Sequence, residues 1–155
     1  MTQAINNRRV LVDSNLLLLM IVGAVNPDWI ELYKRTSIYT TDSYGKLNEL
    51  LDKSSGLIAT PNILTEVSNL LNAAKGTRRL RFYQGLAGLI EQLDEIYVPS
   101  DTVSRHPLFT GLGVTDLGFE EAIRQTQAIA LTDDAPLANH LALQGIDTIN
   151  FNHLR

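Results

Sequence analysis

The sequence contains no cysteine. This absence excludes a disulfide scaffold, a thiol nucleophile and a thiolate zinc site. Basic residues are also few: 13 lysines and arginines stand against 17 aspartates and glutamates, which gives a formal charge of -4. A protein that wraps duplex DNA by charge alone is usually more basic than this. An acidic balance does not exclude a nuclease, because carboxylates that bind a metal add negative charge themselves.

Long hydrophobic runs are missing as well. The longest, residues 16–25, spans ten residues, whereas a helix that crosses a bilayer needs about 20. Arg8 and Arg9 precede this run in the manner of a signal peptide, but Asp13 and Asn15 interrupt the apolar stretch. We therefore expect a cytoplasmic protein with no membrane partner. Hydrophobic residues still make up 45% of the 155 positions, enough for one domain with a buried core.

Short apolar runs alternate with longer segments of helical periodicity. The runs predict five strands, at residues 9–13, 56–60, 95–98, 128–131 and 147–151. The helical segments are residues 14–23, 61–74, 77–93, 115–127 and 136–144, with two more between 27 and 55. This alternation predicts βαβ units and a parallel sheet that is covered on both faces. We expect a single domain over residues 1–155, with 24–56 a longer helical insertion and 111–114 a flexible loop.

Acidic residues follow the predicted strands. Asp13 ends the first strand, Glu66 lies in the helix after the second, and Asp133 and Asp134 come directly after the fourth. Asp116 lies near the start of the helix that leads into that fourth strand. Because the carboxyl ends of parallel strands share one edge of the sheet, where such sheets bind ligands, we expect these carboxylates to converge there.

Convergence of carboxylates is unfavourable without a cation, since like charges at close range oppose one another's ionisation. Oxygen ligands suit Mg²⁺ or Mn²⁺, and such an ion activates water and polarises a phosphodiester. Taken singly, each acid also has an ordinary structural interpretation as a helix cap or turn residue. Asp13 is the hardest to explain in that way, because a buried and unpaired charge after Val-Leu-Val is costly. The joint pattern therefore points to a metal site.

Four short segments resemble the acidic motifs of the PIN domain, in the order that family shows. They are VLVDSN at 10–15, TPNILTE at 60–66, TD at 115–116 and LTDD at 131–134. The resemblance spans essentially the whole chain. It implies a three-layer α/β/α sandwich with a central, mostly parallel sheet of about five strands. It also implies metal-dependent cleavage of RNA with Mg²⁺ or Mn²⁺, as in the VapC-type toxins of toxin–antitoxin pairs.

The resemblance implies catalytic and metal-binding roles for individual acids. Asp13 matches the first motif acid, Glu66 the second and Asp116 the third. The fourth motif usually reads Thr-any-Asp, so Asp134 matches it better than Asp133 does. Polar neighbours of these acids are candidates for orienting them through hydrogen bonds: Ser14, Asn15 and Thr132.

The densest basic run begins nine residues after Glu66 and contains Lys75, Arg78, Arg79 and Arg81. It either contacts an RNA backbone or is simply a solvated helix face, and the second interpretation is the more common one. The family resemblance leaves an antitoxin protein and a second copy of the chain open as partners. Residues 16–22 and 29–33 are apolar stretches that would supply a face for such a second copy.

Two other functions compete with the nuclease. Phosphoryl-transfer domains of the receiver or haloacid-dehalogenase type also place an aspartate on a parallel sheet. They need an acidic pair or an Asp-any-Asp at the first strand and a late lysine, whereas Ser14 and Asn15 follow Asp13 here and the last lysine is Lys75. The remaining alternative is a non-catalytic PIN-like module that binds RNA or protein. The three histidines show no ligand spacing, so they offer no second metal site.

Overall fold

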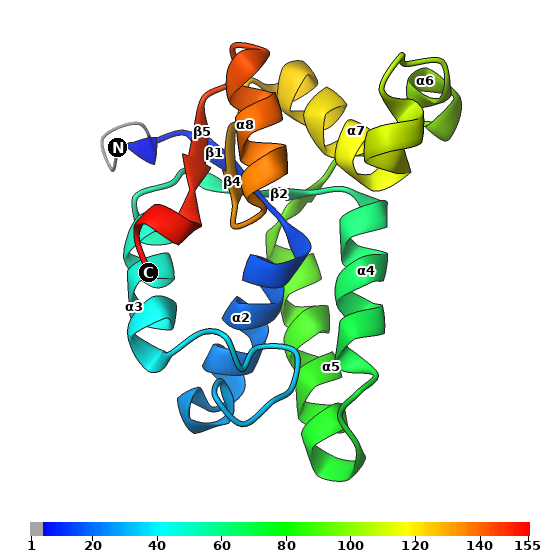
Figure 1. Cartoon of the computed structure of the whole chain (residues 1–155). Coiled ribbons are helices and arrows are strands. Elements are labelled where there is room, and N and C mark those ends of the chain that lie inside the picture. The colour runs from blue at the N-terminus through cyan, green and yellow to red at the C-terminus, as the bar shows by residue number, and fades with distance from the viewer. Residues whose placement is uncertain (1–4) are drawn as a thin grey trace.

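The computed structural model describes residues 5–155, and within them a five-stranded sheet lies at the centre (Figure 1). The strands are β1 (Arg9–Val12), β2 (Gly56–Ala59), β3 (Asp94–Glu95), β4 (Ile129–Thr132) and β5 (Thr148–Asn150). Their spatial order is β3-β2-β1-β4-β5, and every neighbouring pair is parallel. Leu11 in the central strand lies opposite Ile58 of β2 and Ala130 of β4. The predicted parallel α/β fold is thus confirmed.

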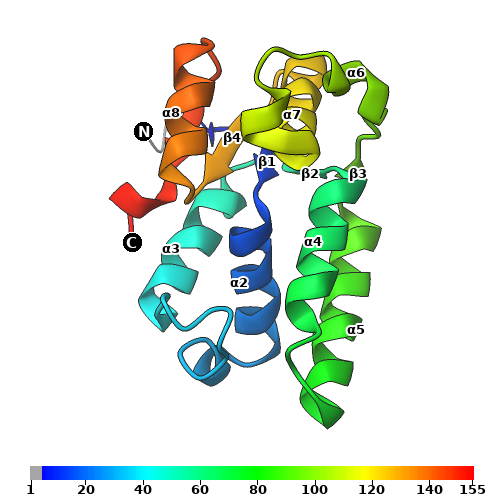
Figure 2. The same cartoon turned by 45° about the vertical axis from the view of Figure 1, so that its right-hand side comes forward.

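Helices cover both faces of the sheet, as Figures 1 and 2 show together. One layer holds α2 (Ser14–Val25), α3 (Thr41–Asp52), α4 (Pro61–Leu71) and α5 (Gly76–Gln92); the other holds α6 (Ser100–Ser104), α7 (Phe109–Thr126) and α8 (Ala135–Leu143). The chain adds strands outward from β1 to β3 and then returns to β4 and β5 on the other side. Right-handed crossovers therefore place the earlier helices on one face and the later helices on the other. The result is the expected three-layer sandwich.

Helix α2 is the centre of its layer. It is apolar around its whole circumference, and Leu16–Leu19 are at most 1% exposed because α3, α4 and α5 all pack around it. A helix that is hydrophobic on all sides is normally buried in this way. Residues 16–22 are therefore core except for the partly buried Met20, so this stretch offers little apolar surface to a second copy of the chain.

The insertion between α2 and β2 also packs into the core. Ile30, Tyr33, Tyr39 and Leu47 are each at most 4% exposed. Only the second expected helix is an α-helix, namely α3. The stretch before it is the short 3₁₀ helix η1 (Pro27–Trp29) followed by turns, in part because the hydroxyl of buried Thr36 donates to the carbonyl oxygen of Ile30 at 2.7 Å and fixes a compact turn.

Two further elements differ from the sequence-based expectations. Helix α7 spans Phe109–Thr126, so residues 111–114 lie within its bounds, but Gly113 has a non-helical backbone, with φ 81° and ψ 179°, and divides α7 into two helical segments at a kink. A positive φ of this size favours glycine, and it kinks the chain between the two segments. The short helix α6 was not expected, and β3 covers only two residues at the edge of the sheet.

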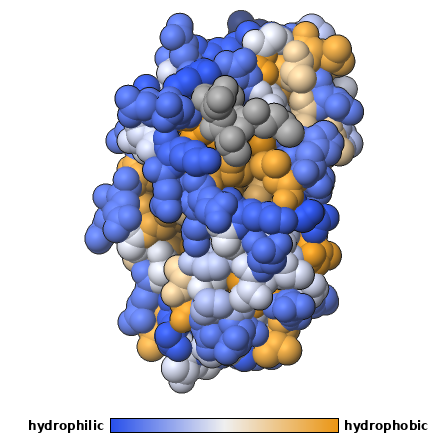
Figure 3. Space-filling model, turned by 90° about the vertical axis from the view of Figure 1, so that its left-hand side faces the viewer, coloured by the Kyte–Doolittle hydropathy of each residue, from blue (hydrophilic) through white to orange (hydrophobic). Residues whose placement is uncertain are grey.

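Hydrophilic residues cover most of the face that carries α3 and the C-terminus, with smaller hydrophobic groups between them (Figure 3). Over residues 5–155, no helix combines the length and the hydrophobicity that crossing a bilayer requires. The expected single domain begins at residue 1, and its first four residues lie outside the described part of the chain.

Candidate active site

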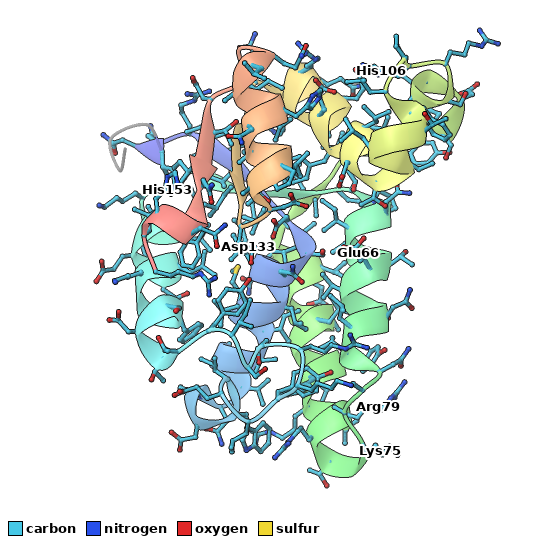
Figure 4. All side chains as sticks on the ribbon, viewed as in Figure 1. Glu66, Lys75, Arg79, His106, Asp133 and His153 are labelled. Atoms are coloured by element: carbon cyan, nitrogen blue, oxygen red, sulfur yellow. The ribbon has the colours of Figure 1, made fainter. Side chains whose placement is uncertain are left out.

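The site lies at the carboxyl ends of β1 and β4. Between these two parallel strands the direction in which the chain adds strands to the sheet reverses. The chain leaves β1 into α2 on one face and leaves β4 into α8 on the other. Such a topological switch point opens a crevice outside the strand ends, where open α/β sheets bind ligands. Asp13 follows β1 there, and its backbone N–H donates to the carbonyl oxygen of Leu131 in β4 at 3.1 Å. Figure 4 shows Asp133 at the same edge.

Asp13 is a buried carboxylate fixed by three donors. It is the N-cap of α2 and accepts a hydrogen bond from the backbone N–H of Leu16 at 3.2 Å. Its other oxygen accepts from the hydroxyl of Thr132 and from the backbone N–H of Asp133 at 3.1 Å. Thr132 therefore contacts Asp13 directly, in agreement with the orienting role predicted for it. These donors leave the side chain little freedom to turn.

The pKa of Asp13 rises from 3.8 to about 7. Burial is the largest cause, because the ionised carboxylate loses water, and the negative charge of Asp133 adds to it. The hydrogen bonds from Thr132, Leu16 and Asp133 act in the opposite direction. The site therefore holds an acid whose charged form is unfavourable until a cation offsets it.

Asp133 is held in place by two residues that the motifs did not single out. The hydroxyl of Tyr39 donates to the Asp133 carboxylate, and the side-chain amide of Asn152 donates to the Asp133 carbonyl oxygen. Tyr39 is 1% exposed. Burial and the bond to Asp133 raise the pKa of this phenol, so it remains a donor. Arg155 lies over the Tyr39 ring, 5.3 Å from its centroid.

A second group of acids lies beside the first. Burial raises the pKa of Asp116, and the charges of Asp134 and Glu66 raise it further, whereas His140 lowers it. Three segments distant in sequence therefore contribute acids that act on one another. The hydroxyl of Ser14 donates to Glu66, so the residue after Asp13 orients an acid of this second group.

Asp133 and Asp134 belong to different groups. Asp133 faces Asp13, whereas Asp134 caps α8 by accepting from the backbone N–H of Leu137 at 3.0 Å and acts on Asp116 through its charge. The backbone N–H of Asp134 also donates to Thr132 at 3.0 Å. One threonine thus contacts both groups, by donating to Asp13 and accepting from Asp134.

Asn15 lies at this edge, in the first turn of α2, whereas the basic run does not. Asn15 is exposed, and no side-chain hydrogen bond joins it to Asp13 in the described structure. Lys75 and Arg79 lie at the far tip of the α4–α5 pair, well below Glu66 and Asp133 in Figure 4. Arg78 and Arg81 pack over the Trp29 ring, 4.5 and 5.3 Å from its centroid, and Arg79 lies 4.4 Å from that of Tyr83. These contacts give most of the run a packing role.

The acids fit a hard divalent cation by donor type. Every candidate ligand is a carboxylate. Burial and then the charges of neighbouring acids raise the pKa values of Asp13 and Asp116, and a bound cation offsets both causes by stabilising the ionised forms. Across residues 5–155, however, no three His, Asp or Glu side chains are grouped closely enough to hold one ion together. Mg²⁺ commonly binds through one or two carboxylates and keeps several waters, so two neighbouring acids suffice.

Stability in the absence of metal is expected to fall as the pH rises from about 4 to about 7. The folded protein keeps the Asp13 proton up to a pKa of about 7, whereas the ordinary pKa is 3.8. The stabilisation that the protonated Asp13 gives the folded state is complete below a pH of 3.8 and is lost as the pH rises through about 7. Urea unfolding in EDTA should show the trend in wild type and a flatter one in Asp13→Asn. Parallel pH trends in the two proteins would contradict the shifted pKa.

Comparisons with known proteins identify no family. No family model matches the chain, and no curated protein matches it. One solved structure that resembles it is described as a domain of a functionally unknown protein from Methanocaldococcus jannaschii DSM 2661. The two share 17% identity over 92% of this chain and 89% of that one, with a TM-score of 0.47.

Proposed function

We propose that this chain is a metal-dependent endoribonuclease that cuts RNA phosphodiesters with a carboxylate-bound Mg²⁺ or Mn²⁺ ion. The main support is the meeting of acids from four separate segments at the switch point of the sheet, with Asp13 buried opposite Asp133 and with Asp116 perturbed by Glu66 and Asp134. A fold gains no stability from gathering like charges, so the cluster indicates chemistry. The choice of RNA rests on the resemblance of the four motifs to those of PIN domains.

The candidate ligands are Asp13, Glu66, Asp116 and Asp134, with Asp133 as a further one. Because no three of them lie close enough to share one ion in the described structure, two neighbouring acids and several waters would hold it. When bound, the ion supplies an activated water and stabilises the charge that develops on the phosphate and the leaving oxygen. The protein's own groups fix the acids around it. Thr132 orients Asp13, Ser14 orients Glu66, and Tyr39 holds Asp133.

In this proposal the enzyme acts in the cytoplasm, where its substrate is an RNA strand. The toxin of a toxin–antitoxin pair is the specific role that the motif resemblance favours. Its regulation would then need an antitoxin protein that covers the carboxyl edge of the sheet. A homodimer remains compatible with this role, although residues 16–22 are core apart from the partly buried Met20 and leave little apolar surface for its interface.

One observation favours a second candidate, a non-catalytic PIN-like module that binds RNA or protein. The described residues hold no ready group of three metal-binding side chains. A module of this kind keeps the fold and the crevice outside the strand ends but cuts nothing. Metal ions would leave its thermal stability unchanged, whereas binding to a folded site must raise it.

The deciding experiment incubates the purified protein with end-labelled single-stranded and structured RNAs in Mn²⁺, Mg²⁺ or EDTA. We expect internal cleavage with either metal and none with EDTA. An Asp116→Asn preparation purified in parallel controls for a contaminating nuclease. Absence of cleavage by wild type in both metals, with no shift in its melting temperature, would reject the enzyme and favour the binding module.

A further inference from the structure

A groove runs along α4 and opens beside the acids. Its volume is about 410 Å³, within the range of about 300–1,000 Å³ that is usual for pockets that bind small molecules. Glu66 lines it, and so does Thr115, the neighbour of Asp116. We call this hollow the α4 groove. Its other polar wall residues are Asn62, Thr65, Asn69, Tyr97 and Ser100.

The α4 wall of the groove is one face of that helix. Asn62, Thr65, Glu66 and Asn69 follow the i, i+3, i+4, i+7 spacing that places side chains on the same side. Apart from Glu66, this face offers amides and hydroxyls, which donate and accept hydrogen bonds without charge. Groups of this kind match the edges of bases and the 2′-hydroxyl of ribose.

The opposite wall presents an aromatic ring to solvent. Tyr97 follows β3 and is 72% exposed, although Val98 beside it is buried. No lysine or arginine lines the groove, so a ligand there is not held by neutralisation of its phosphates. An exposed ring beside uncharged hydrogen-bonding groups is what an unpaired base requires, since every base has a π-face that stacks on an aromatic side chain.

We propose that the α4 groove binds one unpaired nucleotide of a single-stranded RNA next to the bond that is cut. This inference rests on the proposed ribonuclease function. Tyr97 stacks on the base, and Asn62 and Asn69 hydrogen-bond its edge or the ribose. The groove therefore selects unpaired RNA, because a base stacked inside a duplex cannot reach Tyr97. A peptide is the less suitable occupant, since the fully buried core of a protein interface is predominantly apolar.

The test uses Tyr97→Ala and Tyr97→Phe, with Leu143→Ala as the control for loss of an exposed apolar side chain; Leu143 lies on α8 and is 85% exposed. Fluorescence anisotropy in EDTA measures the Kd for a labelled single-stranded oligoribonucleotide, and initial rates in Mn²⁺ measure KM and kcat. Tyr97→Ala should raise Kd and KM together by roughly 5- to 100-fold, the loss of one stacked base. Tyr97→Phe and Leu143→Ala should stay within about twofold of wild type.

The outcomes separate this inference from the function on which it rests. RNA cleavage with a Kd and KM unchanged in Tyr97→Ala would overturn the subsite and leave the nuclease intact. Weaker binding in Tyr97→Ala, restored in Tyr97→Phe, supports the subsite even if wild type cuts no RNA, in which case the nuclease alone fails. Wild type that neither binds nor cuts RNA rejects both.

Discussion

Asp13→Asn is expected to lower metal-dependent RNA cleavage by at least about 100-fold, because a metal's stabilisation of the transition state is worth several kcal/mol and each 1.4 kcal/mol is about tenfold in rate. The substitution removes one negative charge from the switch point of the sheet. The amide keeps the size of the side chain, and Asn caps helices as well as Asp does, so α2 should still begin at Ser14. Initial rates in Mn²⁺ measure the loss of cleavage, and circular dichroism melts of the same preparations show whether the fold is kept.

Asp42→Asn is the matched control. Asp42 also lies at a helix start, in the first turn of α3, but it is exposed and paired with Lys46 at 3.0 Å, away from the strand ends. Its cleavage rate should equal that of wild type within about twofold, because Asp42 lies away from the acids. The loss of an exposed i,i+4 pair should also lower the stability of the fold by only about 0.3–0.5 kcal/mol. A folded Asp13→Asn protein that cleaves as fast as Asp42→Asn would show that the acid after β1 is not part of the reaction.

Phe82→Ala is expected to lower the free energy of unfolding by about 3–5 kcal/mol, the usual cost of a cavity in place of a buried phenylalanine. Phe82 of α5 is fully buried and packs edge-on against Trp29 and Tyr33, with ring centroids 5.8 and 5.1 Å apart. Those two residues belong to the insertion after α2. The substitution therefore tests whether the insertion is core, and urea unfolding monitored by circular dichroism measures it.

Leu80→Ala, on the same helix, is the comparison for Phe82→Ala. Leu80 is 57% exposed, so its loss should change the free energy of unfolding by no more than about 0.5 kcal/mol. Similar small losses in both variants would mean that the insertion does not pack on α5.

The sheet and its acids could be predicted because each has a local signature. Val10, Leu11 and Val12 form an apolar run of strand length that a charge ends, and the run before Asp133 has the same form. Parallel topology then brings both acids to one edge, and the structure places Asp133 close enough to raise the pKa of Asp13. Local pattern and a general rule about parallel sheets were sufficient for this part of the site.

The remaining contacts could not be predicted, because they join segments with no shared local pattern. Tyr39 lies in an irregular turn 94 residues before Asp133 in the sequence, and nothing in its neighbourhood marks it as a donor to that acid. Asn152 did carry a signal, since it follows β5 at the same edge of the sheet. The division of the acids into two groups depends on side-chain orientation, which the positions of Glu66 and Asp116 in the sequence do not reveal.

A titration of the apo protein with Mn²⁺ by isothermal calorimetry tests the central claim, that the acids at the strand ends hold a divalent cation. The prediction is saturable binding by wild type and Asp42→Asn, weakened at least about tenfold in both Asp13→Asn and Asp116→Asn. The same affinity in all four proteins, or no saturable heat in any of them, would contradict it.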